Sequence, residues 1–179
     1  KIIDAKTLFN NINIENLNNH FKKYLKVISF WLKKDLHSVI SSLQNIIYDH
    51  KKDILAIRLL HFNNIFIGID SNFLARHIEI LGSWTKKDPL YNLILGMTSF
   101  AYEENDQLSL AQNLANESLL MSKKDLWSWH ALLHVQDNEL SSDLESNEFF
   151  TSIDWSQYGA IKRHIWWHQA LMHFYKKDF

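Results

Sequence analysis

The sequence predicts an all-α chain, built as a solenoid of about four to five stacked helix-turn-helix hairpins. Its 179 residues include only four Gly and one Pro, and this scarcity of helix breakers suits helices joined by short turns. A Lys-Lys-Asp tripeptide recurs along the chain. Small and large side chains also recur at fixed offsets within the segments that this tripeptide separates.

The Lys-Lys-Asp tripeptide is interpreted as helix punctuation. Its five copies end at Asp35, Asp53, Asp88, Asp125 and Asp178. We expect the two Lys to lie in the last turn of one helix, where cations oppose the negative end of the dipole, and the Asp to cap the next helix. After Asp88, Pro89 suits the first helical position. A chance recurrence in a Lys-rich chain and a phosphate-binding patch are the less favoured alternatives.

The expected helices pair into hairpins in chain order. They are Asn19–Leu32 with Leu36–Tyr48, Ile54–Ile67 with Ser71–Trp84, Pro89–Glu104 with Gln107–Met121, and Leu126–Asn138 with a shorter Ser142–Phe150. Gly159–Tyr175 opens a fifth hairpin, so we expect the chain to be a fragment of a longer protein. We treat residues 1–179 as one domain. Residues 1–18 form a loosely ordered lead-in with a short helix at Ala5–Asn10, and Asp137–Ser156 forms a polar connection.

The repeat length and the register both indicate the tetratricopeptide type. Asp53, Asp88 and Asp125 are separated by 35 and 37 residues, close to the repeat of about 34 residues. In the third hairpin, Leu95, Ser99, Tyr102, Ala111 and Ser118 fall at positions 4, 8, 11, 20 and 27 of the pattern. Trp127, Ala131 and His134, and then Trp166, Ala170 and His173, fall at positions 4, 8 and 11. Small side chains at these positions let paired helices approach. A generic helical bundle is the alternative.

Three motifs carry a family resemblance. They are GMTSFAYEEND at Gly96–Asp106, DLWSWHALLHV at Asp125–Val135 and HIWWHQALMHF at His164–Phe174. In this order they resemble the tetratricopeptide repeat protein 38-like family, and KDILAIRLLHFNNIFIGID at Lys52–Asp70 resembles its preceding repeat. The resemblance implies a tetratricopeptide α-solenoid over most of residues 20–179, without a defined activity. The segment QDNELSSD after Val135 departs from the Glu-Met-Gly-Arg-like turn of the family.

The histidines are the residues most suited to chemistry. His130 and His134 are four apart on one expected helix, as are His164 and His168 on another, so each pair shares a face. The two pairs could hold Zn, Cu, Fe or Ni, with Glu103 or Glu104 as an oxygen ligand or general base. The repeat register instead directs His130 and His134 into a hairpin and His164 toward a groove. That register splits the pairs, so we expect core histidines and no metal, with the four-histidine site as the alternative.

The repeat fold predicts a binding scaffold for a protein or an apolar or mixed peptide. The expected groove residues are Ser128, Leu132, His164, Trp167, Phe174 and Tyr175. A His-based, possibly metal-dependent enzyme is the first alternative, with Glu103, Glu104 and the four histidines as candidate catalytic residues. A structural or oligomer-forming module is the second.

Composition excludes several other classes. The net charge of −1 lacks the basic footprint of a nucleic-acid-binding domain. No run approaches the roughly 20 apolar residues of a membrane helix, and we expect a cytoplasmic protein. There is no Cys, which removes thiol nucleophiles and thiolate metal sites. Phosphate-binding and dinucleotide-binding glycine motifs are missing, so we expect no organic cofactor.

Overall fold

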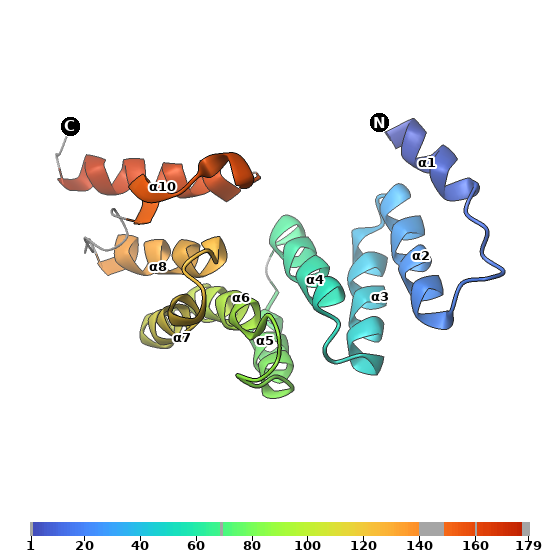
Figure 1. Cartoon of the computed structure of the whole chain (residues 1–179), viewed down its shortest axis with the longest axis horizontal. Helices are drawn as coiled ribbons and strands as arrows, with labels where there is room; N and C mark the ends of the chain where they lie inside the picture. Colours follow the sequence, from blue (N-terminus) through green and yellow to red (C-terminus); the bar gives the residue numbers. More distant parts are fainter. Residues whose placement is uncertain (1, 69, 140–148, 160, 177–179) are drawn as a thin grey trace. The chain divides into compact units, whose positions relative to one another are not determined.

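A computed structural model describes residues 2–68, 70–139, 149–159 and 161–176. Within these ranges the chain forms α-helices and one 3₁₀ turn, without any strand (Figure 1), so the all-α prediction is confirmed. No helix in the described part of the chain is long and apolar enough to span a bilayer. The chain divides into two compact units, residues 1–73 and 74–179, and each is described by itself.

The described residues of the first unit form four complete helices in chain order. They are α1 (Ile2–Asn10), α2 (Asn19–Leu32), α3 (Leu36–Asp49) and α4 (Ile54–Ile67). The bounds of α2 and α4 are those that the sequence predicts, α3 is one residue longer, and α1 begins earlier than the expected Ala5. Helices α2, α3 and α4 bury a shared apolar cluster of Val27, Val39, Leu43, Ile46, Ala56 and Leu60.

Two of the Lys-Lys-Asp turns cap helices in this unit as predicted. The Asp35 side chain accepts the backbone N–H of Ser38 at 3.1 Å, and Asp53 accepts that of Ala56 at 3.0 Å. The Lys pairs, however, lie in the turns beyond the helix ends rather than in the last helical turns. Helix α2 stops at Leu32 because Lys34 adopts a left-handed φ of 60°, a conformation that terminates helices.

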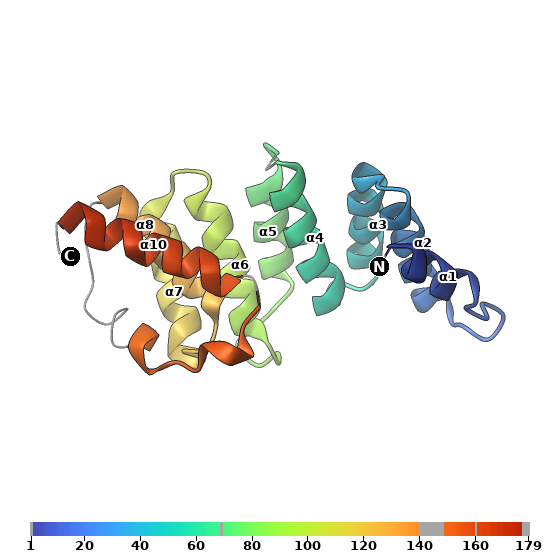
Figure 2. The ribbon, with the colours of Figure 1, turned by 90° about the horizontal axis from the view of Figure 1, so that it is seen from above.

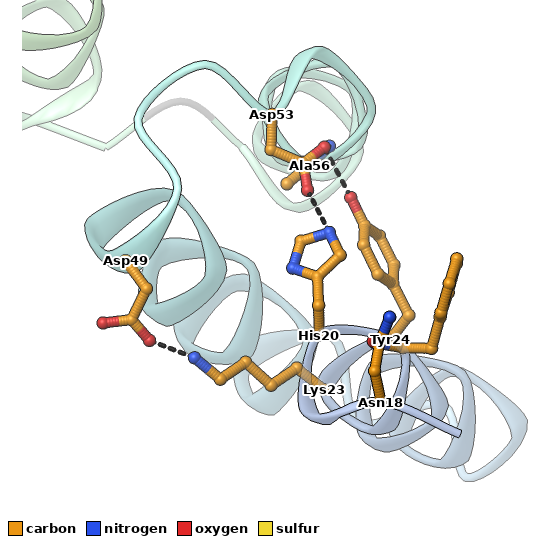
Figure 3. A network of polar contacts seen from close by, with 8 residues as sticks. Asn18, His20, Lys23, Tyr24, Asp49, Asp53 and Ala56 are labelled. Atoms are coloured by element: carbon orange, nitrogen blue, oxygen red, sulfur yellow. Dashed lines mark hydrogen bonds and ion pairs between the residues drawn. The ribbon is translucent and has the colours of Figure 1, made fainter. Parts of the chain in front are cut away.

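Asp53 also ties α2 to the start of α4 (Figure 3). The Tyr24 hydroxyl donates to Asp53 Oδ1 at 2.7 Å, and His20 Nε2 lies 3.0 Å from Oδ2. On the same side of α2, Lys23 pairs with Asp49 at the end of α3. Burial, and then the hydrogen bond to Asp53, raise the pKa of Tyr24 far above its ordinary value.

The described residues of the second unit form further helical elements, besides a helical stretch at 149–152. They are α5 (Phe73–Gly82, which begins at the unit boundary), α6 (Tyr91–Glu103), α7 (Leu108–Met121), α8 (Leu126–Glu139), the 3₁₀ turn η1 (Trp155–Gln157) and α10 (Ile161–Lys176). Helices α6, α7 and α8 pack against one another, and α10 runs along α8 (Figures 1 and 2). Their core consists of Ala115, Leu119, Leu126, Trp129, Leu132, Leu133, Phe150 and Ile165.

The start of α6 differs from the prediction. The helix begins at Tyr91 instead of Pro89, after Leu90 with a left-handed φ of 64°. Asp88 does not cap it; its carboxylate accepts the backbone N–H of Thr85 at 2.8 Å and lies 3.0 Å from the Thr85 hydroxyl. The side chain of Asp88 therefore closes the preceding turn, and the cap position of α6, Leu90, has no side-chain hydrogen bond.

Other predicted bounds are corrected or fall outside the described residues. Helix α5 is shorter than the expected Ser71–Trp84. The expected Ser142–Phe150 helix lies outside the described residues except for its last two positions, which are helical. Asp178 also lies outside them. The expected Asp137–Ser156 connection begins later than predicted, because α8 continues to Glu139.

Helix α8 is fixed by a buried polar network at its start. Asp125 Oδ1 accepts the backbone N–H of Trp127 at 3.1 Å. The hydroxyls of Ser118 and Ser128 lie 3.1 and 3.0 Å from Asp125 Oδ2, and 2.7 Å from each other. Ser128, expected to line a groove, is instead fully buried in this network. Asp125 thus joins α7 to α8.

Candidate metal centre

The structure brings the four histidine side chains into one cluster. His130 and His134 extend from α8, and His164 and His168 extend from α10. Each contributes a ring nitrogen that lies within 4.8 Å of the other three. The two pairs therefore share one site, and the prediction that they lie on different surfaces is wrong. Residues four apart share one face of a helix. Because α10 runs along α8, the face of α8 that carries His130 and His134 lies against the face of α10 that carries His164 and His168.

The spacing within the cluster suits a small cation. Nε2 of His164 and Nε2 of His168 are 3.2 Å apart. Two nitrogens that bind one tetrahedral zinc at about 2.1 Å are separated by about 3.4 Å. The centroids of the His130 and His134 rings lie 4.4 Å apart, as do those of His134 and His168. One pair of nitrogens thus already has the spacing of a zinc site, and all four nitrogens lie within 4.8 Å of one another.

Two carboxylates contact the outer nitrogens of the cluster. Glu103, the last residue of α6, has Oε1 3.1 Å from Nδ1 of His134. Asp137, on α8, has Oδ2 3.0 Å from Nδ1 of His168. Metal-bound histidines in proteins are commonly held by such carboxylates. Glu103 is among the candidates predicted from the sequence, whereas Asp137 is not, although it falls where the expected helix Leu126–Asn138 and the expected connection overlap, one helical turn after His134.

Glu104 occupies a different position from Glu103. Its carboxylate is within 4.8 Å of Glu103 and His134, but its side chain is exposed. Partial burial, followed by the charge of Glu103, raises the pKa of Glu104. Glu104 therefore lies at the solvent side of the cluster, whereas Glu103 is only 7% exposed.

Aromatic side chains enclose the inner part of the cluster. The ring of Phe100 stacks on His130 at 5.2 Å, and Trp127 meets the same ring edge-on at 5.5 Å. His130 and His168 are 3% and 7% exposed, while His164 is open to solvent. His130 and His168 are thus the buried members of the cluster, the His134 side chain is 22% exposed, and His164 lies on the solvent side.

Burial and mutual proximity favour the neutral form of two of these imidazoles, those of His164 and His168. Burial lowers the pKa of His168, opposed by its hydrogen bond to Asp137. Partial burial of its ring, followed by the charges of His168 and His134, lowers the pKa of the more exposed His164. Neutral imidazole is the form that binds metals. Nε2 of His134 is buried and has no hydrogen-bond partner among the described residues, so a bound cation would satisfy an atom that is otherwise costly to bury.

The residues expected to line a groove do not share one environment. Ser128 and Leu132 are buried, at 0% and 7% exposure. Trp167, Phe174 and Tyr175 are 57% to 62% exposed on α10, and His164 belongs to the histidine cluster.

No family model and no solved structure matches this chain.

Proposed function

We propose that this chain is a transition-metal-binding protein whose centre is formed by His130, His134, His164 and His168. The observation that carries the proposal is the convergence of four imidazole nitrogens within 4.8 Å of one another. Supporting it, two of these rings are held at Nδ1 by carboxylates and turn Nε2 toward the cluster. Zinc is the simplest occupant, since it accepts four nitrogen ligands in a tetrahedron.

The number of histidines favours a structural or metal-carrying role over an enzyme. A structural zinc site uses four protein ligands, whereas a catalytic site keeps one position for water or substrate. Four imidazoles would fill the tetrahedron. The enzyme alternative requires one of them, most simply the exposed His164, to leave the metal during turnover.

We also propose that the fold is of the tetratricopeptide type and that the chain is related to the tetratricopeptide repeat protein 38-like family. The support lies in the α6–α7 hairpin. Ser99 and Ala111, at pattern positions 8 and 20, are fully buried. The Ser99 hydroxyl donates to the Ala111 carbonyl at 2.7 Å, so the two helices approach closely where the pattern requires small residues.

The direct test is elemental analysis of the untagged protein, supplied with zinc and then dialysed. We expect one zinc per chain in the wild type and its loss in a His130→Asn/His168→Asn variant. His37→Asn is the matched control, because His37 is exposed on α3 of the other unit. A wild type that stays helical by circular dichroism yet retains no metal after supplementation with zinc, cobalt, copper, nickel or iron would refute the proposal.

A peptide-binding scaffold is a second candidate, and one observation favours it. Trp167, Phe174 and Tyr175 expose apolar surface on α10, and large exposed aromatics are frequent in binding sites. The chemistry fits an apolar or mixed peptide. A screen of such peptides by fluorescence anisotropy tests it: Trp167→Ala should abolish any binding found, whereas Leu120→Ala, an exposed residue of α7, should not. A screen without binders removes this candidate.

A further inference from the structure

Glu103 and Asp137 reach the histidine cluster from different helices and in the same way. Glu103 ends α6 and contacts Nδ1 of His134, whereas Asp137 lies on α8 and contacts Nδ1 of His168. The two distances are 3.1 and 3.0 Å. Within the described residues, the ion pairs of both carboxylates are with these histidines. The arrangement therefore consists of two equivalent carboxylate–imidazole pairs around one cluster.

These contacts determine which nitrogen of each ring faces inward. An ionised carboxylate only accepts hydrogen bonds, so Nδ1 of His134 and Nδ1 of His168 carry the proton when the rings are neutral. Nε2 of each ring then presents a lone pair to the cluster. For His168 that lone pair faces Nε2 of His164 at 3.2 Å. His164 must therefore donate a proton to it or share a cation with it.

The two carboxylates also set the charge of the centre. Four neutral imidazoles contribute none, while Glu103 and Asp137 contribute two negative charges beside a largely buried cluster. A second oxygen of each carboxylate, Oε2 of Glu103 and Oδ1 of Asp137, is buried without a hydrogen-bond partner among the described residues. Buried charge without compensation is costly. A divalent cation balances both carboxylates, whereas a monovalent cation leaves one negative charge uncompensated.

Resting on the proposed function, we infer that Glu103 and Asp137 are positioning residues that select a divalent cation over Cu⁺ at the four-histidine centre. They do so without ligating the metal. Each holds a histidine in the tautomer that ligates through Nε2, makes that nitrogen a stronger donor, and supplies one of the two charges that a divalent ion needs.

The test compares Zn²⁺ and Cu⁺ affinities, measured by chelator competition, in the wild type, Glu103→Gln, Asp137→Asn and the double variant. Each single change should weaken Zn²⁺ binding by about 10- to 100-fold, as carboxylate partners of metal-bound histidines generally do, with a larger loss in the double variant. Cu⁺ affinity should fall by a smaller factor than Zn²⁺ affinity in each variant, because Cu⁺ loses the same positioning of the histidines but, as a monovalent ion, is attracted less strongly by the carboxylate charge. Retained Cu⁺ binding also shows that the histidine cluster remains folded in each variant.

Glu117→Gln is the matched control, because Glu117 pairs with Lys86 elsewhere in the same unit and loses the same charge. The visible spectrum of bound Co²⁺ adds a readout that general destabilisation would not move. We expect its bands to shift in the Glu103 and Asp137 variants and to stay in place in the control.

The failures of the two proposals are distinguishable. Wild-type protein that binds neither Zn²⁺ nor Cu⁺, and none of cobalt, nickel and iron, refutes the metal centre itself. Wild-type protein that binds Zn²⁺, with unchanged Zn²⁺ affinity in both single variants, overturns only the role of the carboxylates. Equal losses of Zn²⁺ and Cu⁺ affinity overturn the selectivity.

Discussion

Gly96 on α6 lies so close to Ser128 on α8 that a Cβ atom at Gly96 would come within 2.6 Å of the Ser128 Oγ. The same atom would approach Asp125 Oδ2 to 2.7 Å. Both neighbours are fixed in the buried hydrogen-bond network that starts α8. The absence of a side chain at Gly96 is therefore what lets α6 and α8 approach, and this approach brings Glu103, two helical turns further along α6, to His134 on α8.

Gly96→Ala should destabilise the protein and weaken metal binding together. Overpacking of a tight helix contact costs about 1–3 kcal/mol. Because the added methyl group would push α6 away from α8, it would also move Glu103 away from His134. Urea unfolding followed by tryptophan fluorescence measures the first effect, and zinc competition measures the second. Gly82→Ala is the control, since a Cβ there meets nothing within 4 Å. Equal stability of the two variants would contradict the close contact.

Helix α10 is anchored to the second unit by Ile165, which is fully buried in the apolar core. Ile165→Ala should lower the free energy of unfolding by about 2–5 kcal/mol, as expected for a core truncation that leaves a cavity. Trp167, two positions along the same helix, is 60% exposed, and Trp167→Ala should change stability by about 0.5 kcal/mol or less. Thermal unfolding of both variants measures this contrast. A larger loss at Trp167 than at Ile165 would show that α10 packs through another face.

Metal removal should loosen α10 more than the rest of the chain. Two of the four histidines proposed to bind the metal lie on α10. A metal ion present at 100 times its dissociation constant stabilises the bound state by about 2.7 kcal/mol, which lowers the equilibrium constant for local opening by about 100-fold. We therefore expect amide hydrogen exchange in α10 to accelerate by up to about 100-fold when zinc is chelated. Helices α2 and α3 of the other unit are the internal control. Unchanged exchange in α10, despite zinc release, would show that the metal does not hold this helix.

The sequence predicted the helices well because their ends carry local signals. Asp35 and Asp53 cap their helices through hydrogen bonds that span three residues, so the tripeptide located these boundaries. The prediction that Asp88 caps the following helix was wrong for a related reason. The same carboxylate that caps a following helix also accepts a nearby Thr hydroxyl, and here Thr85 is its partner. Local sequence did not distinguish the two outcomes.

The site was predicted in its parts but not in its assembly. Spacing of four residues placed His130 with His134 and His164 with His168. Whether the pairs meet depends on the rotation of α10 about its axis against α8, which is set by the burial of Ile165 and not by the repeat register. Asp137 is not predicted as part of the site, although it lies at the end of the expected helix Leu126–Asn138, because the polar sequence that begins at Asp137 is also typical of a connection.

Tyr24 provides a test of the contact between α2 and α4. Its hydroxyl donates to Asp53 Oδ1, and its pKa is raised in the folded state by burial and by this carboxylate. A group whose folded pKa exceeds its unfolded value stabilises the fold fully below the unfolded pKa, here about 10. That stabilisation is lost as the pH rises toward the folded pKa. Ionised Tyr24 would place a phenolate beside Asp53.

Tyr24→Phe should therefore be less stable than the wild type near pH 8, by about 1 kcal/mol for the lost hydrogen bond. Above about pH 10 the wild type should lose stability faster than the variant, by at most about 1.4 kcal/mol per pH unit. The difference in free energy of unfolding between the two proteins therefore narrows, and at higher pH the variant becomes the more stable. Urea unfolding from pH 8 to 11 measures it. Tyr48→Phe, on the 80% exposed Tyr48 of α3, should follow the wild type throughout. A difference between Tyr24→Phe and wild type that stays constant across this range would mean that Tyr24 ionises as freely in the folded chain as in the unfolded one.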